Sequence, residues 1–203
     1  AFRAALAWAR ADSENDDAFS EYLATADEGG ANPGLNPQPF FETAPYDLSS
    51  DDERPLAVYF EQPNCRQCDD LHQKVLIHET ARAQAEKMRS VQIDMWSDTP
   101  LTTPDGRPLT ARAFARELSV QFAPTVVFFD STGQEVMRLD GAFRTFHTQG
   151  ILRYVNDKAY LEQSSFQRYL GELAEHWREQ GLDVDIWSYD LPVSRNGETV
   201  VVH

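Results

Sequence analysis

The pattern of apolar positions along the middle of the chain predicts an alternation of strands and helices. Short runs rich in Val, Ile, Phe and Tyr are typical of buried strands, and longer stretches with apolar residues three or four positions apart are typical of helices. Their order predicts a central sheet with helices on both faces. The first connections have the form of βαβ crossovers, so we expect parallel strands there and an antiparallel hairpin after them. The predicted strands span 54–61, 91–96, 125–129 and 135–139, and the predicted helices span 65–88, 110–118, 146–156 and 164–180.

The two ends of the chain have patterns of their own. Residues 1–28 predict two helices separated by acidic residues, and the Gly- and Pro-rich residues after them predict an irregular linker. Near the other end, Asn196-Gly197 lies between apolar residues, which favours a hairpin turn. We therefore expect a helical N-terminal arm and linker at 1–45, the main domain at 46–181, and a C-terminal tail with a hairpin at 182–203.

Composition narrows the classes of partner. The net charge of −15 argues against nucleic acid, because phosphate backbones are bound by clusters of Lys and Arg. No apolar stretch approaches the roughly 20 residues that span a bilayer, so we expect no membrane insertion. The chain begins with Ala1 in place of Met, and we expect it to be processed, either by removal of a secretory signal or by trimming.

Cys65 and Cys68 are the only cysteines of the chain. They follow the apolar run 56–60 and begin a predicted helix, with Arg66 and Gln67 between them. The N–H groups and dipole at a helix start favour a thiolate on the first cysteine. The second lies one turn along, close enough to form a disulfide. A CxxC pair after a strand in an α/β pattern indicates a redox pair.

His72 suggests a competing chemistry, because Cys65, Cys68 and His72 share one face of the predicted helix. Such a trio could bind zinc or copper, but a structural zinc site needs a fourth ligand and the chain has no second cysteine pair. We therefore expect no metal and no cofactor, and we expect His72 on the surface or in packing.

Phe122-Ala123-Pro124-Thr125 is the second informative motif, a proline directly ahead of a predicted strand. Together with the CxxC pair at its place in the element order, it resembles the thioredoxin fold. The resemblance implies a cis-proline that lies against the two cysteines, and a preceding residue that offers backbone groups to an extended substrate. Ala123, Pro124 and Thr125 are therefore the expected substrate-binding residues.

Further stretches resemble periplasmic thioredoxins of the SoxW type, which are associated with sulfur oxidation. The most discriminating are the Tyr-Val pair at 154–155 and the Phe-Gln-Arg-Tyr run at 166–169. The resemblance implies an exported, periplasmic reductase. A membrane thiol electron donor would supply it, and its substrates would be cysteine-containing, sulfur-handling proteins. The other stretches that carry the resemblance are 58–62, 124–130, 138–141, 152–153 and Tyr160.

The chain departs from typical thioredoxins around the cysteines. Tyr59 stands where they have a buried Asp, Asn64 where they have Trp, and Arg66-Gln67 where they have Gly-Pro. The resemblance therefore sets neither the redox potential nor the route of the proton.

The residues themselves suggest a division of roles. We expect Cys65 to be the nucleophile that forms a mixed disulfide and Cys68 to resolve it. Arg66 should stabilise the Cys65 thiolate, while Asp69 and Asp70 oppose it. Glu61 is the nearest candidate for a proton acceptor, with a solvated carboxylate at the strand end as the alternative reading.

Two other functions remain open at this point. A disulfide oxidase or isomerase would use the same motif with a less reducing pair, and a non-catalytic module would use the cysteines for docking or metal delivery. Aromatic residues give a further expectation: Trp96, Phe122, Phe128 and Phe129 either line a substrate groove or belong to the core. Trp177 and Trp187 are expected to pack the C-terminal helix and tail against the body.

Overall fold

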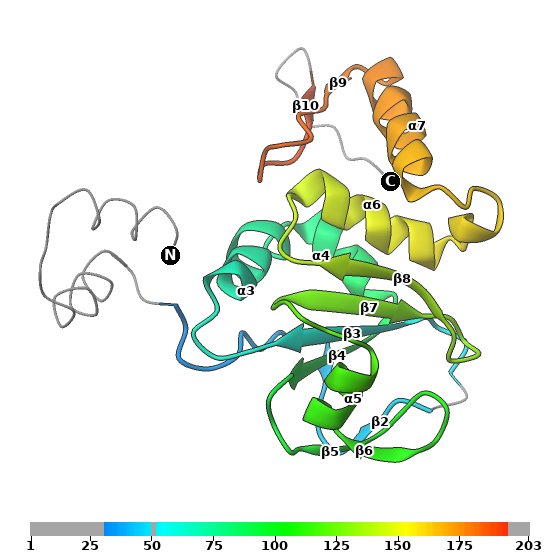
Figure 1. Cartoon of the computed structure of the whole chain (residues 1–203). Helices are drawn as coiled ribbons and strands as arrows, with labels where there is room; N and C mark the ends of the chain where they lie inside the picture. The colour runs from blue at the N-terminus through cyan, green and yellow to red at the C-terminus, as the bar shows by residue number, and fades with distance from the viewer. Residues whose placement is uncertain (1–30, 50–51, 195–203) are drawn as a thin grey trace, which may run out of the picture. The chain divides into compact units, whose positions relative to one another are not determined.

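The computed structural model describes residues 31–49 and 52–194 (Figure 1). The two helices predicted within 1–28 and the Asn196-Gly197 turn lie outside these residues. Within them, the chain forms a mixed sheet covered on both faces, which is the predicted α/β, thioredoxin-like architecture (Figure 1).

The central sheet has the strand order β1-β4-β3-β7-β8. Strands β1 and β4 are parallel, as are β4 and β3, whereas β7 is antiparallel to β3 and β8 is antiparallel to β7. The strand β1 forms inside the linker that we expected to be irregular, because it adds to the edge of β4. The strands span Phe41–Glu42 (β1), Leu56–Glu61 (β3), Arg89–Asp94 (β4), Thr125–Phe129 (β7) and Glu135–Asp140 (β8).

The first predicted crossover, from β3 to β4, joins parallel strands, but the second connection does not. The chain leaves β4 and returns as β7 in the opposite direction, because a small hairpin and a helix bring it back to the sheet edge at which β4 ended. In this register Thr125 pairs with Phe60. The proline loop ahead of β7 therefore lies beside the loop that follows β3 and carries the cysteines.

The predicted helix at 65–88 is broken into three parts. Helix α3 (Arg66–Asp70) continues into the π-helix η1 (Leu71–Val75), and α4 (Glu79–Glu86) starts afresh after it. The break occurs where His78 takes an extended conformation (φ −70°, ψ 127°) as the N-cap of α4. Periodicity alone could not find this break, since apolar spacing continues across it.

The side chains of β3 alternate between two cores, as the period of a strand requires. Leu56, Val58 and Phe60 join a core with Phe114 of α5 (Ala111–Glu117). The alternate residues face α3, η1, α4 and α6 (Thr145–Asn156). The apolar members of that second core include Ala57, Tyr59, Leu71, Val75, Ala81, Ala85, Ile151 and Leu152.

A small second sheet lies beside α5 in the order β2-β5-β6. Strands β5 and β6 form a hairpin whose turn contains Gly106 at φ +83°, a backbone conformation that glycine adopts at little cost. The strands span Tyr46–Asp47 (β2), Pro100–Thr102 (β5) and Pro108–Thr110 (β6).

The C-terminal part packs on α6 through a third core, in which Trp177 is buried as predicted. Gly150 of α6 lies at this crossing, where an added Cβ would force the end of the Leu170 side chain to move. Trp187 packs less than we expected, since 74% of it is exposed and its ring lies 6.2 Å from the His147 ring of α6. The elements are the 3₁₀ turn η2 (Ala159–Leu161), α7 (Phe166–Glu179), and the paired strands β9 (Leu182–Asp183) and β10 (Val193–Ser194).

An aromatic cluster joins α6 to α7. The ring of Tyr154 lies 5.3 Å from Phe166, 5.0 Å from Tyr169 and 6.1 Å from Tyr160. The sequence stretches that discriminate most in the resemblance thus meet in one packing contact, away from the cysteines.

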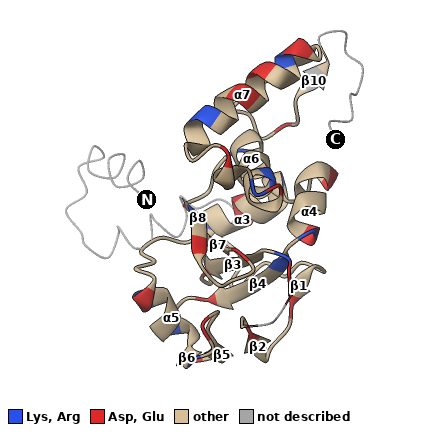
Figure 2. Ribbon diagram, turned by 90° about the vertical axis from the view of Figure 1, so that its right-hand side faces the viewer, with Lys and Arg blue, Asp and Glu red and all other residues tan. Residues whose placement is uncertain are grey.

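Charged residues are spread over the helix surfaces, and α7 carries both signs (Figure 2). None of the described helices is long and apolar enough to cross a membrane.

Candidate functional site: the Cys65–Cys68 pair

The two cysteines form a disulfide at the start of α3, with their Cα atoms 5.2 Å apart. Cys65 is the N-cap of the helix, and its Sγ accepts a hydrogen bond from the Cys68 backbone N–H at 3.1 Å. Cys65 is 7% exposed and Cys68 only 1%. In the reduced protein the N–H group would stabilise a thiolate on Cys65, which is also the more accessible sulfur.

The Ala123–Pro124 peptide bond is cis, and the loop lies against the disulfide. The Cys65 Sγ is 3.5 Å from the Ala123 carbonyl oxygen, and Pro124 is buried. Thr125 is also buried, with its Oγ1 3.0 Å from the Phe122 carbonyl oxygen. Ala123 therefore has backbone groups beside the reactive sulfur, whereas the Thr125 side chain holds the loop together.

The charged residues around the pair are engaged in contacts of their own. Asp70 forms an ion pair with Lys74 at 2.6 Å, and Asp69 accepts hydrogen bonds from Asn32 and Asn36 at 3.0 and 2.7 Å. These contacts offset part of the repulsion that we expected between the two acids and a Cys65 thiolate. Of the residues between the cysteines, Arg66 and Gln67 are both exposed.

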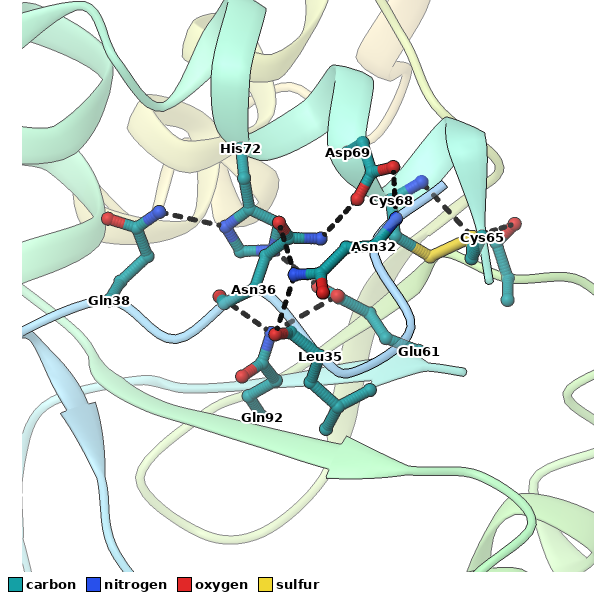
Figure 3. A network of polar contacts seen from close by, with 11 residues as sticks. Asn32, Leu35, Asn36, Gln38, Glu61, Cys65, Cys68, Asp69, His72 and Gln92 are labelled. Carbon is teal, nitrogen blue, oxygen red and sulfur yellow. Dashed lines mark hydrogen bonds and ion pairs between the residues drawn. A yellow bond between two sulfur atoms is a disulfide. The ribbon is translucent and has the colours of Figure 1, made fainter. Parts of the chain in front are cut away.

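Glu61 is not the solvated carboxylate of the alternative reading, because it is 0% exposed. Its Oε1 lies 2.7 Å from Nε2 of His72, and its Oε2 accepts a hydrogen bond from Gln92 at 3.1 Å (Figure 3). His72 is buried too, with 1% of its side chain exposed, and its Nδ1 lies 3.1 Å from Nε2 of Gln38. Both ring nitrogens of His72 are thus engaged, which argues against the Cys65, Cys68 and His72 metal trio.

Residues 32–38, which we call the strap, complete the polar network (Figure 3). The Asn32 carbonyl oxygen accepts from the Asn64 N–H at 2.8 Å, and the Asn36 carbonyl oxygen accepts from Gln92 at 2.9 Å. The apolar pattern of the sequence did not predict the strap. Its signal was a run of amide side chains, of Asn32, Asn36 and Gln38, just ahead of the first strands.

Tyr59 occupies the position of the buried Asp of typical thioredoxins. Its burial, and then the negative charge of Glu61, raise the pKa of the phenol well above its ordinary value. The phenol therefore stays protonated and cannot serve as the base that an Asp would be.

Exposed aromatic side chains lie next to the two loops. Phe122 is 60% exposed, just ahead of Ala123, and Trp96 is 58% exposed and donates to the Gln62 side chain at 2.7 Å. Phe128 and Phe129 belong to the core instead. Two of the four aromatics therefore belong to the core, and the other two are exposed beside the loops.

A cleft of about 430 Å³ begins at Gln67 and runs between α3, the start of α6 and the tail. Tyr189 anchors the tail there, since its ring lies 3.8 Å from the Arg144 guanidinium and its carbonyl oxygen accepts from His78 at 2.7 Å. The lining is Gln67, Asp70, Ala142, Phe143, Arg144, His147, Trp187 and Tyr189.

With this geometry established, comparison with known proteins defines the class. The family model described as "Thioredoxin-like domain" matches residues 46–156, which is more than half of the chain. The chain therefore belongs to the thioredoxin-like domain family. No significant match was found among the curated proteins.

One of the similar solved structures shows the same fold over most of its length. A thioredoxin-fold protein from Helicobacter pylori superposes with a TM-score of 0.57 at 14% identity, covering 64% of this chain and 89% of the other. Thioredoxin from Fasciola hepatica has a TM-score of 0.38 at 20% identity, covering 54% and 98%. Thioredoxin O2 from Arabidopsis thaliana, in its oxidised state, has a TM-score of 0.39 at 16% identity, covering 53% of this chain and 80% of the other. The family and the CxxC pair are consistent with thiol–disulfide oxidoreductase chemistry.

Proposed function

We propose that the protein is a periplasmic reductase of protein disulfides, linked to the oxidation of sulfur compounds. In this proposal it is exported, receives electrons from a membrane thiol donor and passes them to cysteines of sulfur-handling proteins. The resemblance of 58–62, 138–141 and 166–169 to the SoxW type supports this assignment. The chemistry needs no metal or cofactor.

The observation that carries the catalytic part is the position of the Cys65 Sγ. It accepts the Cys68 N–H at 3.1 Å and lies 3.5 Å from the Ala123 carbonyl oxygen, so a thiolate there is stabilised and faces backbone that a substrate strand can pair with. The neighbouring Phe122 and Trp96, both exposed, favour a polypeptide over a small disulfide as the substrate.

The proposed reaction has two displacements and transfers two electrons. The Cys65 thiolate attacks one sulfur of the substrate disulfide, the other sulfur leaves as a thiolate and takes a proton, and a mixed disulfide remains. Cys68 then loses its proton and attacks the Cys65 Sγ, which releases the second substrate thiolate and oxidises the pair. The membrane dithiol donor restores the two thiols and becomes a disulfide itself.

Insulin reduction with dithiothreitol as electron donor tests this chemistry. We expect the wild type to accelerate precipitation of the insulin B chain, Cys65→Ser to show no acceleration, and Cys68→Ser to accumulate a mixed disulfide visible by intact mass. A Cys65→Ser variant with wild-type activity would contradict the mechanism.

The cellular part of the proposal needs separate tests. Proteins trapped by Cys68→Ser in the source organism should be sulfur-handling proteins, identified after non-reducing electrophoresis. Fractionation of cells that express the full-length gene product should place it in the periplasm, and a purely cytoplasmic product would overturn the assignment.

A further inference from the structure

In the second displacement, the thiol of Cys68 must lose its proton before it can attack. Cys68 is 1% exposed, so its thiol cannot pass its proton directly to bulk water. The thiolate is the form that attacks a disulfide, and a buried thiol therefore needs a proton acceptor nearby. Tyr59, at the position of the usual buried acid, is protonated and cannot accept.

Glu61 and His72 lie on either side of the cysteine pair in the sequence. Glu61 ends β3, four residues before Cys65, and His72 lies four residues after Cys68 where α3 continues into η1. Residues four apart on a helix share a face, with Cβ atoms about 5–6 Å apart. His72 therefore lies on the same side of the α3–η1 stretch as Cys68, and the Glu61 carboxylate is bonded to the His72 ring.

Hydrogen bonding fixes the orientation of the two groups. The amide Nε2 of Gln38 can only donate, so the Nδ1 of His72 accepts and the ring proton lies on Nε2. That proton is donated to Glu61 at 2.7 Å, while Gln92 donates to the other carboxylate oxygen. Each carboxylate oxygen still has a lone pair that can accept a proton.

The other titratable groups around the pair are differently engaged. On β3 the neighbour is Tyr59, and on α3 it is Asp69, which accepts from the strap. On β4 it is Asp94, which is paired in register with Glu61 and accepts the Trp96 N–H at 2.9 Å. The strap contributes amides that donate rather than ionise.

We propose that the Glu61–His72 pair takes up the proton of the Cys68 thiol during the second displacement, with His72 as the residue that positions the carboxylate. This inference rests on the proposed reductase function. The proton moves from the Cys68 Sγ to the pair, the new thiolate attacks the Cys65 Sγ, and the bond from Cys65 to the substrate sulfur breaks. The substrate thiolate takes a proton from water, and the pair later returns its proton to water, which restores the starting state.

A stopped-flow reaction of the reduced protein with dithiobis(nitrobenzoate) separates the two steps. The first coloured thiolate is released when Cys65 attacks, and the second when Cys68 resolves the mixed disulfide. At pH 7 we expect Glu61→Gln and His72→Gln to slow the second release on the order of 100-fold while the first release changes by no more than about twofold. At pH 9 the deficit should shrink, because an ordinary thiol ionises there without help.

Tyr59→Phe is the matched control, since it alters a buried neighbour of Glu61 without removing a proton acceptor. Its two releases should keep wild-type rates and pH dependence. A purely structural role for Glu61 and His72 would slow both releases together at every pH, and that result would overturn the proposal. So would wild-type second-release rates in folded variants. A wild type that shows no second release would overturn the proposed function itself, and the inference with it.

Discussion

The two sides of strand β3 differ in how they use burial. On the side covered by α5, Leu56, Val58 and Phe60 enter a core of apolar residues. On the side covered by α3 and η1, the alternate residues begin as apolar but end at Glu61, a fully buried carboxylate bonded to His72 and Gln92.

The difference shows that burial destabilises the fold at only one end of β3, where the Glu61 carboxylate is buried. Apolar burial is favourable wherever it occurs, whereas a buried carboxylate is tolerated only when its hydrogen bonds are satisfied. The polar network lies at the end of β3 that leads into the cysteine loop. We infer that one side of the strand serves stability and the other serves the redox pair.

Phe60→Ala gives the largest expected effect on stability. The ring is 0% exposed and contacts Phe114 of α5, so its removal should lower the free energy of unfolding by about 3–5 kcal/mol. Urea denaturation measures the loss. The insulin-reduction rate per folded molecule should stay near wild type. A loss of rate in the folded fraction would contradict the inference that this side of β3 serves stability alone.

His72→Ala should have the next largest effect, with a different signature. It leaves the buried Glu61 carboxylate without one of its donors, which should lower the free energy of unfolding by about 3 kcal/mol. Unlike Phe60→Ala, it should also slow turnover of the folded protein. Glu61→Gln in the same background should recover part of the stability, since it removes the charge, and no recovery would contradict a buried charged carboxylate.

Phe122→Ala tests the exposed rim beside the disulfide. Its side chain contributes little to the core, so the free energy of unfolding should barely change. If the rim binds polypeptide, the KM for insulin should rise about fivefold, equivalent to about 1 kcal/mol, with kcat unchanged. Dithiobis(nitrobenzoate) is the control substrate, and an equal KM change for both substrates would argue against a polypeptide-binding rim.

His147→Gln gives the smallest expected effect and concerns the cleft at the tail. Burial lowers the pKa of His147 below its ordinary 6.5, so the unfolded chain binds the proton more readily. The stability that neutral His147 contributes to the folded state is therefore fully present above about pH 6.5, and it falls as the pH drops below that value. The variant should lose less of its Tm between pH 7 and pH 5 than the wild type, by calorimetry, and identical losses would rule out a depressed pKa.

The sequence predicted the parts of this account that depend on local pattern. The four long strands β3, β4, β7 and β8, the CxxC pair at a helix start and the proline directly ahead of β7 were each found from the pattern of residues. The chain reversal into β7 and the break before α4 were missed. Both depend on which edge or face a segment packs against, and apolar spacing does not encode this.

Within the site, too, local pattern identified residues but not their three-dimensional surroundings. Glu61 was found as a candidate, but its burial was not, because the strap that covers it comes from residues 32–38 and joins it only in three dimensions. His72 was interpreted from its spacing to the cysteines, whereas its partners are on β3 and the strap. Long-range polar contacts leave no periodic trace in a sequence.

The reduction potential of the Cys65–Cys68 pair tests the central claim most directly. It can be measured by equilibration with glutathione or dithiothreitol and mass-spectrometric counting of free thiols. We predict a value at or below about −250 mV, as befits a reductase that is supplied by a membrane dithiol. A value above about −180 mV would contradict the account and indicate an oxidase or isomerase.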